Sequence, residues 1–473
     1  MRSCFVLIIC VVLVSGCGGG ASSGDIQDPD AVDTSDGMDL GSIDNPGAID
    51  TPVANDDQDQ GAADSDSRDP GGESGISDTA SDPAGDPNQG DGVPPVDTAG
   101  NTDVPDAFVP HPDPKTVPLF QADAVLDFSL DFTPDQWALY QLTITKGIKD
   151  YAHCNLTFGT NSFVDAACRP KGNPTSWADQ KKPQFVVRFN HWDANGRFMG
   201  LRAINLEYSP YHFAPIRDRL GLEFMAAAGV VSSRVSHVRL SVSGQDYGLY
   251  QNIEVVDHEF LEDNFVDPSG NLYEQGNKLI TNEAINDLTR IWDLEDLVDG
   301  EPLTGDHTSF FASLAQLTDM HQILREMAAE AVLPTGDNFI NGGSNFFWYD
   351  QPGRGFLLIP WDLDDVFSEW ARTDSDFWAY WGEPGTGLPP CKFWQLVQQN
   401  PVWNSEFLAS VRELRDGPFQ AVKTRVADVC AMIRPIHETD AYREGDMQEF
   451  DADCTDMVAR IDARTVFLRQ AAP

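Results

Sequence analysis

Basic residues are scarce in this sequence: 31 lysines and arginines stand against 75 aspartates and glutamates over 473 residues, which gives a formal net charge of −44. Because there is no basic tract, such a surface repels phosphate backbones, and nucleic acid is excluded as an expected partner. Beyond the first residues, no apolar run is long enough to cross a membrane. The sequence also lacks a Cys-x-x-Cys pair and a His-rich cluster, which argues against a zinc site.

Cysteine is scarce as well. Five of the eight cysteines lie beyond residue 17: Cys154, Cys168, Cys391, Cys430 and Cys454. In an exported protein, two disulfides and one remaining thiol are the default expectation. We predict the pairs that are close in sequence, Cys154–Cys168 and Cys430–Cys454, and the sequence alone leaves other pairings open.

The first residues are typical of a targeting segment. One positive charge, at Arg2, precedes an apolar run from Phe5 to Val14 that is too short to span a membrane as a mature helix. The next residues, Ser15-Gly16-Cys17, resemble the end of a bacterial lipobox. We therefore expect residues 1–16 to be a lipoprotein signal peptide and Cys17 to carry a lipid anchor at the cell envelope or surface. Gly18 after the anchor favours the outer membrane, and the alternative is an ordinary secretory signal.

Residues 17–114 differ in composition from everything that follows. They are rich in Asp, Gly, Pro and Ser, and they carry 23 acidic residues against the single basic Arg68. Such a segment has too little apolar surface to offset its chain entropy, so we expect a disordered, extended tether. Calcium binding is the alternative, but the segment lacks the regular ligand-plus-glycine spacing of a calcium loop.

Residues 115–473 are long enough for one large domain or two closely packed lobes. Their first part, Val125 to Tyr273, is mostly β in pattern, with one helix from Pro215 to Ala228 that ends at Gly229. After Tyr273 the pattern turns helical, with Ser309 to Val332 as the clearest helix and further helices from Lys392 to Arg469. We predict an α+β protein with a β-rich N-terminal lobe, a mainly helical C-terminal lobe and a cleft between them.

One stretch, residues 336–367, concentrates polar side chains around two apolar segments, Phe346–Tyr349 and Phe356–Pro360. The polar residues form two groups: Asp337, Asn338, Asn341 and Asn345, then Asp362, Asp364 and Asp365. Carboxylates at the end of a buried strand need a metal, a hydrogen-bond donor or water as partner. The pattern indicates a site, and the alternative is a surface loop rich in turn-forming residues.

Several motifs, taken in order, resemble one family. They are Arg169-Pro-Lys-Gly172-Asn-Pro-Thr-Ser176, Lys181-Lys182-Pro-Gln-Phe185, Tyr211 to Asp218, Gly248-Leu-Tyr250 with Glu254, Gly270-Asn-Leu-Tyr273, and Pro360-Trp-Asp362-Leu-Asp364. Together they resemble the CotH (spore coat protein H) family of secreted atypical protein kinases. The resemblance implies a bilobal, atypical protein-kinase-like fold that transfers the γ-phosphate of ATP, with Mg²⁺ or Mn²⁺, to Ser or Thr of exported proteins.

The resemblance also assigns roles that suit phosphoryl transfer, in which positioning and charge neutralisation do most of the work. Asp362 matches the family's metal-holding aspartate, and Asp364 shares the metal or its waters. Asp337 matches the catalytic aspartate that accepts the substrate hydroxyl proton. Asn341 and Asn345 supply amide oxygens to the metal or fix the loop.

The phosphates need a cation, and Lys182, just before the strand that starts at Phe185, is the expected one, with Lys181 as the fallback. Gly172 belongs either to a phosphate-covering loop or to an ordinary turn. Glu254 is either a cleft residue near the adenine or an exposed charge on a strand edge.

Two departures from the family pattern matter. Glu274 stands where a lysine is frequent, and Pro183-Gln184 adds a residue between the lysines and the next aromatic. The alternative function, from another class, is a surface scaffold or adhesion module that keeps the fold without the activity.

Overall fold

The computed structural model describes residues 110–473 apart from 336, 342, 369–372 and 375–390. The predicted signal peptide, the lipidation site at Cys17 and the predicted tether up to residue 109 lie outside the described residues. Among the helices that are described, none combines the length and the apolar character needed to cross a membrane.

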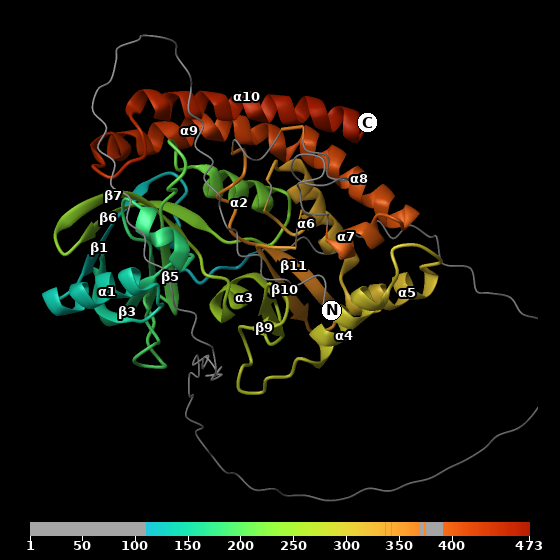
Figure 1. Cartoon of the computed structure of the whole chain (residues 1–473), viewed down its shortest axis with the longest axis horizontal. Coiled ribbons are helices and arrows are strands. Elements are labelled where there is room, and N and C mark those ends of the chain that lie inside the picture. The colour runs from blue at the N-terminus through green and yellow to red at the C-terminus, as the bar shows by residue number, and fades with distance from the viewer. Residues whose placement is uncertain (1–109, 336, 342, 369–372, 375–390) are drawn as a thin grey trace, which may run out of the picture. The chain divides into compact units, whose positions relative to one another are not determined.

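Seven strands close into a barrel in the first half of the described chain (Figure 1). They are β1 (Val125–Asp131), β2 (Ala152–Phe158), β3 (Asn161–Pro170), β4 (Phe185–Arg188), β5 (Ala203–Glu207), β6 (Val235–Val242) and β7 (Gln245–Ile253). Their order around the barrel is β1-β2-β3-β4-β5-β7-β6, antiparallel except where β6 returns to β1. The β pattern expected for Val125 to Tyr273 is therefore confirmed.

Alternation of side chains explains how the barrel is filled. In β1, Leu126, Phe128 and Leu130 are buried, while the residues between them are more exposed. The disulfide Cys154–Cys168 links β2 to β3, and it is the first of the two predicted pairs to be confirmed. The barrel thus holds its own apolar core, separate from that of the helices.

A second sheet has four strands in the order β11-β10-β8-β9. These are β8 (Asn271–Glu274), β9 (Lys278–Leu279), β10 (Phe346–Gln351) and β11 (Gly355–Pro360). The two apolar segments of the polar stretch are β10 and β11, paired antiparallel with Phe346 opposite Pro360. The ladder continues past the strands, because the Trp361 amide donates to the Asn345 carbonyl at 3.0 Å.

Ten α-helices and two short 3₁₀ turns are described. The turns are Val117–Leu119 and Pro174–Asp179; the helices are α1 (Pro134–Lys146), α2 (Arg217–Ala227), α3 (His258–Asn264), α4 (Thr289–Gly300), α5 (Thr308–Leu317), α6 (Met320–Val332), α7 (Lys392–Val397), α8 (Pro401–Asp416), α9 (Pro418–Thr439) and α10 (Met447–Ala471). The mixed α+β class is confirmed. The helices that matter for the site are α2, which follows β5, and α6, which precedes the polar stretch.

The prediction of one helix over Ser309–Val332 is wrong, because this segment is the two helices α5 and α6. The chain leaves the helical path at Thr318 and Asp319, where the Asp319 amide donates to the Phe356 carbonyl of β11 at 2.8 Å. The Asp319 side chain then caps α6 by accepting from the Gln322 amide. A contact with a strand distant in sequence interrupts a pattern that looks continuous.

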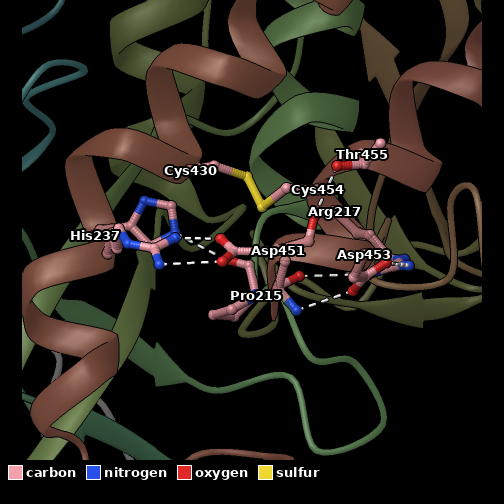
Figure 2. Close-up of a disulfide and its surroundings, with 10 residues drawn as sticks. Pro215, Arg217, His237, Cys430, Asp451, Asp453, Cys454 and Thr455 are labelled. Atoms are coloured by element: carbon pink, nitrogen blue, oxygen red, sulfur yellow. Dashed lines mark hydrogen bonds and ion pairs between the residues drawn. A yellow bond between two sulfur atoms is a disulfide. The ribbon is translucent and has the colours of Figure 1, made fainter. Parts of the chain in front are cut away.

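The last two helices, α9 and α10, run side by side and reach back to α2 (Figures 1 and 2). The disulfide Cys430–Cys454 joins them, which confirms the second predicted pair. Next to it, Asp453 accepts two hydrogen bonds from the Arg217 guanidinium, at 2.7 and 3.0 Å, and one from the Ala214 amide at 2.9 Å. The start of α2 is thus attached to α10. Cys391 keeps its thiol and is buried.

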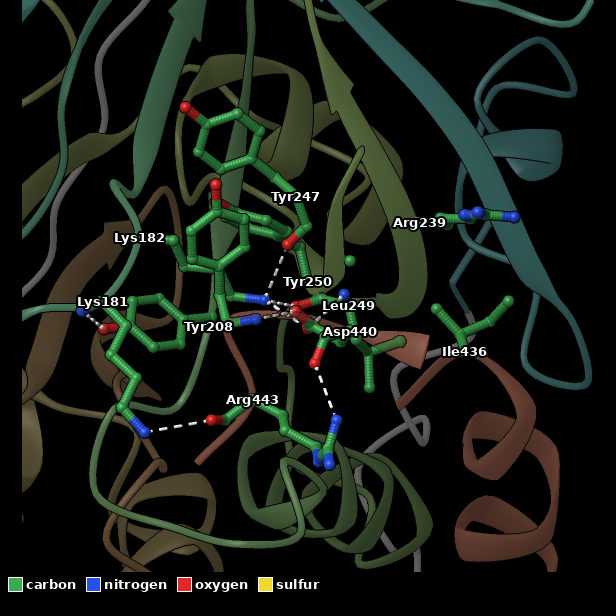
Figure 3. Close-up of polar contacts among 12 residues, drawn as sticks. Lys181, Lys182, Tyr208, Arg239, Tyr247, Leu249, Tyr250, Ile436, Asp440 and Arg443 are labelled. Carbon is green, nitrogen blue, oxygen red and sulfur yellow. Dashed lines mark hydrogen bonds and ion pairs between the residues drawn. The ribbon is translucent and has the colours of Figure 1, made fainter. Parts of the chain in front are cut away.

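Lys182 attaches the same helical pair to the barrel (Figure 3). Its Nζ lies 2.8 Å from Asp440 Oδ2 and donates to the carbonyls of Tyr247 and Leu249 at 3.0 and 2.7 Å. The Lys182 and Asp440 side chains are 2% and 1% exposed. Gly248 lets them approach, because a Cβ there would lie 2.0 Å from the Asp440 carboxylate carbon. The buried pair joins segments 258 residues apart.

Replacement of Asp440 should destabilise the fold strongly. In Asp440→Ala, the Lys182 ammonium loses its counter-charge while it stays buried, which costs about 3–5 kcal/mol in comparable cases. Lys181→Ala is the control, because this neighbouring lysine pairs with Glu444 and is 46% exposed, and such pairs are worth less than about 1 kcal/mol. Urea unfolding measures both. Equal stability of the two variants would contradict a structural role for the buried pair.

Candidate active site

The site is centred on an ion pair between Lys171 and Glu207. Lys171 follows the last residue of β3, and Glu207 is the last residue of β5. The Lys171 Nζ lies 2.6 Å from Glu207 Oε2, and the two side chains are only 15% and 8% exposed. Lys171 is also 5.7 Å from the centre of the Trp361 ring, the residue before Asp362. The barrel therefore presents a lysine to the end of β11.

A second buried carboxylate, Asp218, lies on the first turn of α2 beside this pair. It is held by Gln251 of β7, whose amide nitrogen donates to Asp218 Oδ2 at 3.4 Å. Gln251 pairs with Glu207 across the β5–β7 ladder. Glu207 Oε1 and Asp218 Oδ1 are buried, and neither finds a hydrogen-bond partner in the part of the chain that is described. Buried oxygens of this kind call for a bound donor or cation.

The third component is the turn that carries Asp362 and Asp364. Asp362 has a φ of +54°, an uncommon conformation for a residue other than glycine. Leu363 between them packs against α2 at Gly221, where an added Cβ would lie 2.9 Å from the Leu363 Cβ. Because Gly221 has no Cβ, α2 can pack closely against this turn. Asp218 of α2 and the turn residues Asp362 and Asp364 therefore lie on neighbouring elements.

Electrostatics reflect an excess of carboxylates around one lysine. Burial lowers the pKa of Lys171, but Glu207 and Asp362 raise it by more, so this ammonium stays charged. Burial, reinforced by Asp362, Asp218 and Asp365, raises the pKa of Asp364 well above its usual range. Burial also raises the pKa of Asp218 well above its usual value, helped by Glu207 and Asp362. A divalent cation would relieve this mutual repulsion.

These residues fit a divalent metal in the form in which nucleotide enzymes use it. Among the described residues, no group of three or more His, Cys, Asp or Glu side chains is gathered closely enough to hold a metal ion. Mg²⁺ typically takes only one or two carboxylates and completes its shell with water and phosphate oxygens. Asp362 and Asp364 are the carboxylates that could supply them, and the hard oxygen ligands suit Mg²⁺ or Mn²⁺.

Asp337 lies in the loop between α6 and β10, and it is tied to the start of β10 by two hydrogen bonds. Its carboxylate accepts a hydrogen bond from the Ser344 hydroxyl, and its carbonyl accepts one from the Asn345 amide at 3.1 Å. Asn345 in turn pairs with Trp361 across the ladder. Asn341 uses its side-chain amide to close the loop on the Thr335 carbonyl, at 3.2 Å. The structure therefore brings Asp337, Asn345 and Asp362 to one end of the β10–β11 ladder.

Two buried glutamates on α6, Glu326 and Glu330, lie next to this loop. The Glu330 carboxyl accepts hydrogen bonds from the amides of Phe339 and Ile340, at 3.2 and 3.1 Å. Glu326, one turn earlier, is fully buried, and neither of its carboxyl oxygens finds a hydrogen-bond partner among the described residues. Burial raises the pKa of Glu330 to about 7, and burial beside Glu330 raises the pKa of Glu326 well above its usual value. Both shifts favour the protonated form of the pair. Glu330 anchors the backbone just after Asp337.

Two of the residues expected to contact phosphate lie in another cluster. Lys182 is bound by Asp440 and two carbonyls, and the carboxylates that act on it are Asp440, Asp246 and Glu444 rather than Asp362. Lys181 pairs with Glu444 at 2.6 Å. The structure therefore does not place Lys182 at the Asp362 turn, where the sequence led us to expect it; Lys182 binds Asp440 instead.

Gly172 and Glu254, the other two residues expected to contact the nucleotide, lie in different places. Gly172, with a φ of +86°, directly follows Lys171 and turns the chain into the Pro174–Asp179 turn. Glu254 is buried and accepts from the Arg234 side chain at 2.9 Å, so its description as an exposed edge charge is wrong. Only Gly172 is adjacent to the Lys171 centre.

Sequence reasoning missed Lys171, Glu207 and Asp218. Two of them lie inside motifs that carry the family resemblance: Lys171 in the motif that starts at Arg169, and Asp218 at the end of the motif from Tyr211 to Asp218. The available signal for Lys171 was its place directly after a strand, β3, and directly before a glycine, Gly172, which has a φ of +86° in the structure. Nothing local in the sequence marks Glu207, which acquires its partner through the closure of the barrel.

The fold and this centre define a mixed α+β protein with a buried cluster of one lysine and several carboxylates. A family model described as CotH kinase protein matches residues 168–468. Inner spore coat protein H of Bacillus subtilis (strain 168) is 21% identical over 321 residues, which cover 62% of this chain and 83% of that protein. Since the matched residues make up more than half of the chain, the protein belongs to the CotH kinase family.

Similarity to solved structures is weaker. One chain of the complex described as the Shewanella oneidensis MR-1 toxin–antitoxin system HipA, HipB and its operator DNA aligns with a TM-score of 0.32 and 16% identity. The alignment covers 57% of this chain and 60% of that chain, so less than two thirds of it is spanned.

Gly221→Ala should destabilise the protein and separate α2 from the Asp362 turn. The added Cβ meets Leu363 at 2.9 Å, and overpacking of this kind costs about 1–3 kcal/mol, more than the roughly 1 kcal/mol that alanine gains over glycine in a helix. Gly300→Ala, where no atom lies within 4 Å of the new Cβ, is the matched control and should be neutral or stabilising. Urea unfolding decides, and identical shifts for both variants would contradict the packing argument.

The glutamate pair should make stability depend on pH. Because the pKa of Glu330 in the folded protein, about 7, lies above its ordinary value, the stabilisation from protonation is complete below about pH 4.5 and is lost as the pH rises through 7. Glu326→Gln places an amide that cannot ionise beside Glu330. Its free energy of unfolding relative to wild type should rise between pH 5 and 8, on the order of 1–3 kcal/mol.

Glu330→Gln is the contrasting variant, because its amide group can accept from only one of the two backbone amides. It should be destabilised across the whole pH range. A pH-independent difference between Glu326→Gln and wild type would show that the pair holds no proton.

Proposed function

We propose that this protein is an exported, lipid-anchored atypical protein kinase that transfers the γ-phosphate of ATP to Ser or Thr of extracytoplasmic or surface proteins. The single observation that carries the proposal is the Lys171–Glu207 ion pair, which faces Asp218 and the Asp362–Asp364 turn. A lysine paired with a glutamate, opposite a metal-binding aspartate, is the arrangement that protein kinases use.

Each part of the site has a task in this reaction. Lys171, with Glu207 holding it in place, would bind phosphate oxygens. Asp362 and Asp364 would hold Mg²⁺ or Mn²⁺, which supplies charge neutralisation for the transferred phosphoryl group. Asp337 would orient the acceptor hydroxyl and take its proton. Lys171 thereby replaces Lys182 and Lys181 in the role for which the sequence suggested them.

The remaining parts of the proposal concern architecture and place. We infer that the barrel and the helical part act as the N- and C-terminal lobes of a kinase-like fold. Cys17 would carry the lipid, and the acidic residues 17–114 would hold the kinase away from the membrane. The support for these statements is the family membership together with the lipobox-like sequence.

A transfer assay with the full-length protein tests the activity. Labelled ATP, Mg²⁺ or Mn²⁺ and a serine-rich acceptor should yield a labelled acceptor. Lys171→Met and Asp362→Ala should each lower the rate at least about 100-fold, as removal of a charge-stabilising group does in other enzymes. Lys181→Met is the matched control and should retain the rate, because this lysine lies outside the Lys171 centre.

Failure of the proposal would take one of two forms. Equal losses in Lys171→Met and Lys181→Met would contradict the assignment of Lys171. No transfer, together with no rise in melting temperature upon addition of ATP and Mg²⁺, would favour the surface scaffold, since a ligand that binds the folded state must stabilise it.

A further inference from the structure

Ser344 occupies the position where the acceptor hydroxyl of a substrate would be expected. Its Oγ donates a hydrogen bond to the carboxylate of Asp337, the residue to which the proposed function assigns the substrate hydroxyl. Asp337 is exposed and Ser344 half-buried. Water could satisfy an exposed carboxylate equally well, so burial does not require this contact.

Ser344 lies at the end of the β10–β11 ladder from which the Asp362 turn also starts. Phe346 lies opposite Pro360, and Asn345 pairs with Trp361. Beyond that pair the two chains leave the ladder, because Asn345 and Asp362 both have a positive φ, of +56° and +54°. Ser344 and Asp362 therefore lie at the same end of the β10–β11 ladder, each one residue beyond its last pair.

The backbone around Ser344 is suited to present a side chain at this point. Gly343 has a φ of +72°, a conformation that glycine adopts without strain, and it turns the chain into β10. The Ser344 amide donates to the Asn338 carbonyl at 3.3 Å, and Glu330 holds the neighbouring amides of Phe339 and Ile340. The serine is therefore held at Asp337 by a supported loop.

We propose that Ser344 is a self-phosphorylation site, modified within its own chain; this inference rests on the proposed kinase activity. The Ser344 Oγ forms a bond to the γ-phosphorus of ATP while the bond from that phosphorus to the β–γ bridging oxygen breaks. ADP leaves, and the hydroxyl proton passes to Asp337 and then to solvent. No further reactant is needed, and the product is phosphoserine at position 344.

Mass spectrometry of the full-length protein after incubation with ATP and Mg²⁺ tests this proposal. Phosphate should appear at Ser344, at a rate that does not change with protein concentration. Ser344→Thr should carry phosphothreonine at the same position, and Ser344→Ala should lose this modification. Ser405→Ala, at an exposed serine of α8, is the matched control and should keep full modification of Ser344.

A mixing experiment separates modification within a chain from modification between chains. When Asp362→Ala protein carrying a mass-distinguishing tag is mixed with wild type, its Ser344 should stay unmodified. Phosphate on that serine would overturn the intramolecular proposal.

The same reactions distinguish failure of this inference from failure of the proposed function. Transfer to an external acceptor with no phosphate on Ser344 would overturn the self-phosphorylation site and leave the kinase intact. No phosphate on either the acceptor or Ser344 would overturn both.

Discussion

The site depends on one electrostatic constraint: several carboxylates crowd around Lys171 in a buried environment. Glu207 alone would satisfy the ammonium, as a salt bridge at 2.6 Å does. Asp218, Asp362 and Asp364 add negative charge that this lysine cannot balance, and burial together with repulsion from the neighbouring carboxylates raises the pKa of Asp218 and of Asp364. A fold that keeps uncompensated carboxylates together loses stability unless a cation or a protonated group joins them. The constraint is therefore informative about function.

Comparison of the two buried lysines sharpens this point. Lys182 has one carboxylate and two carbonyls within hydrogen-bond distance, which leaves its three donor hydrogens fully used. Lys171 has Glu207, and buried oxygens of Glu207 and Asp218 next to it lack partners among the described residues. A saturated buried lysine fastens two parts of a structure. An ion pair surrounded by unsatisfied carboxylate oxygens is prepared for a ligand.

Local patterns in the sequence carried much of the fold and part of the site. The β pattern of Val125 to Tyr273 predicted the region that holds the barrel, and the proximity of the cysteines in sequence predicted both disulfides. Asp362 and Asp337 were recognisable because they follow or precede strands in a known motif. The choice between Lys171 and Lys182 could not be made this way, since both lysines adjoin strand ends. It depends on Asp440, which lies 258 residues from Lys182 in sequence, and on the register that sets Glu207 opposite Gln251.

The C-terminal helices explain how elements so far apart in sequence stay in register. Two of the buried polar contacts that join the α9–α10 pair to the rest of the chain lead towards the site: Asp440 binds Lys182 of the barrel, and Asp453 binds Arg217 at the start of α2. Arg217 directly precedes Asp218, and α2 packs on Leu363 through Gly221. The disulfide Cys430–Cys454 joins the two helices, so both contacts belong to one cross-linked helical pair. Barrel, α2 and the Asp362 turn are thus held to one another by a support that itself contributes none of the carboxylates around Lys171.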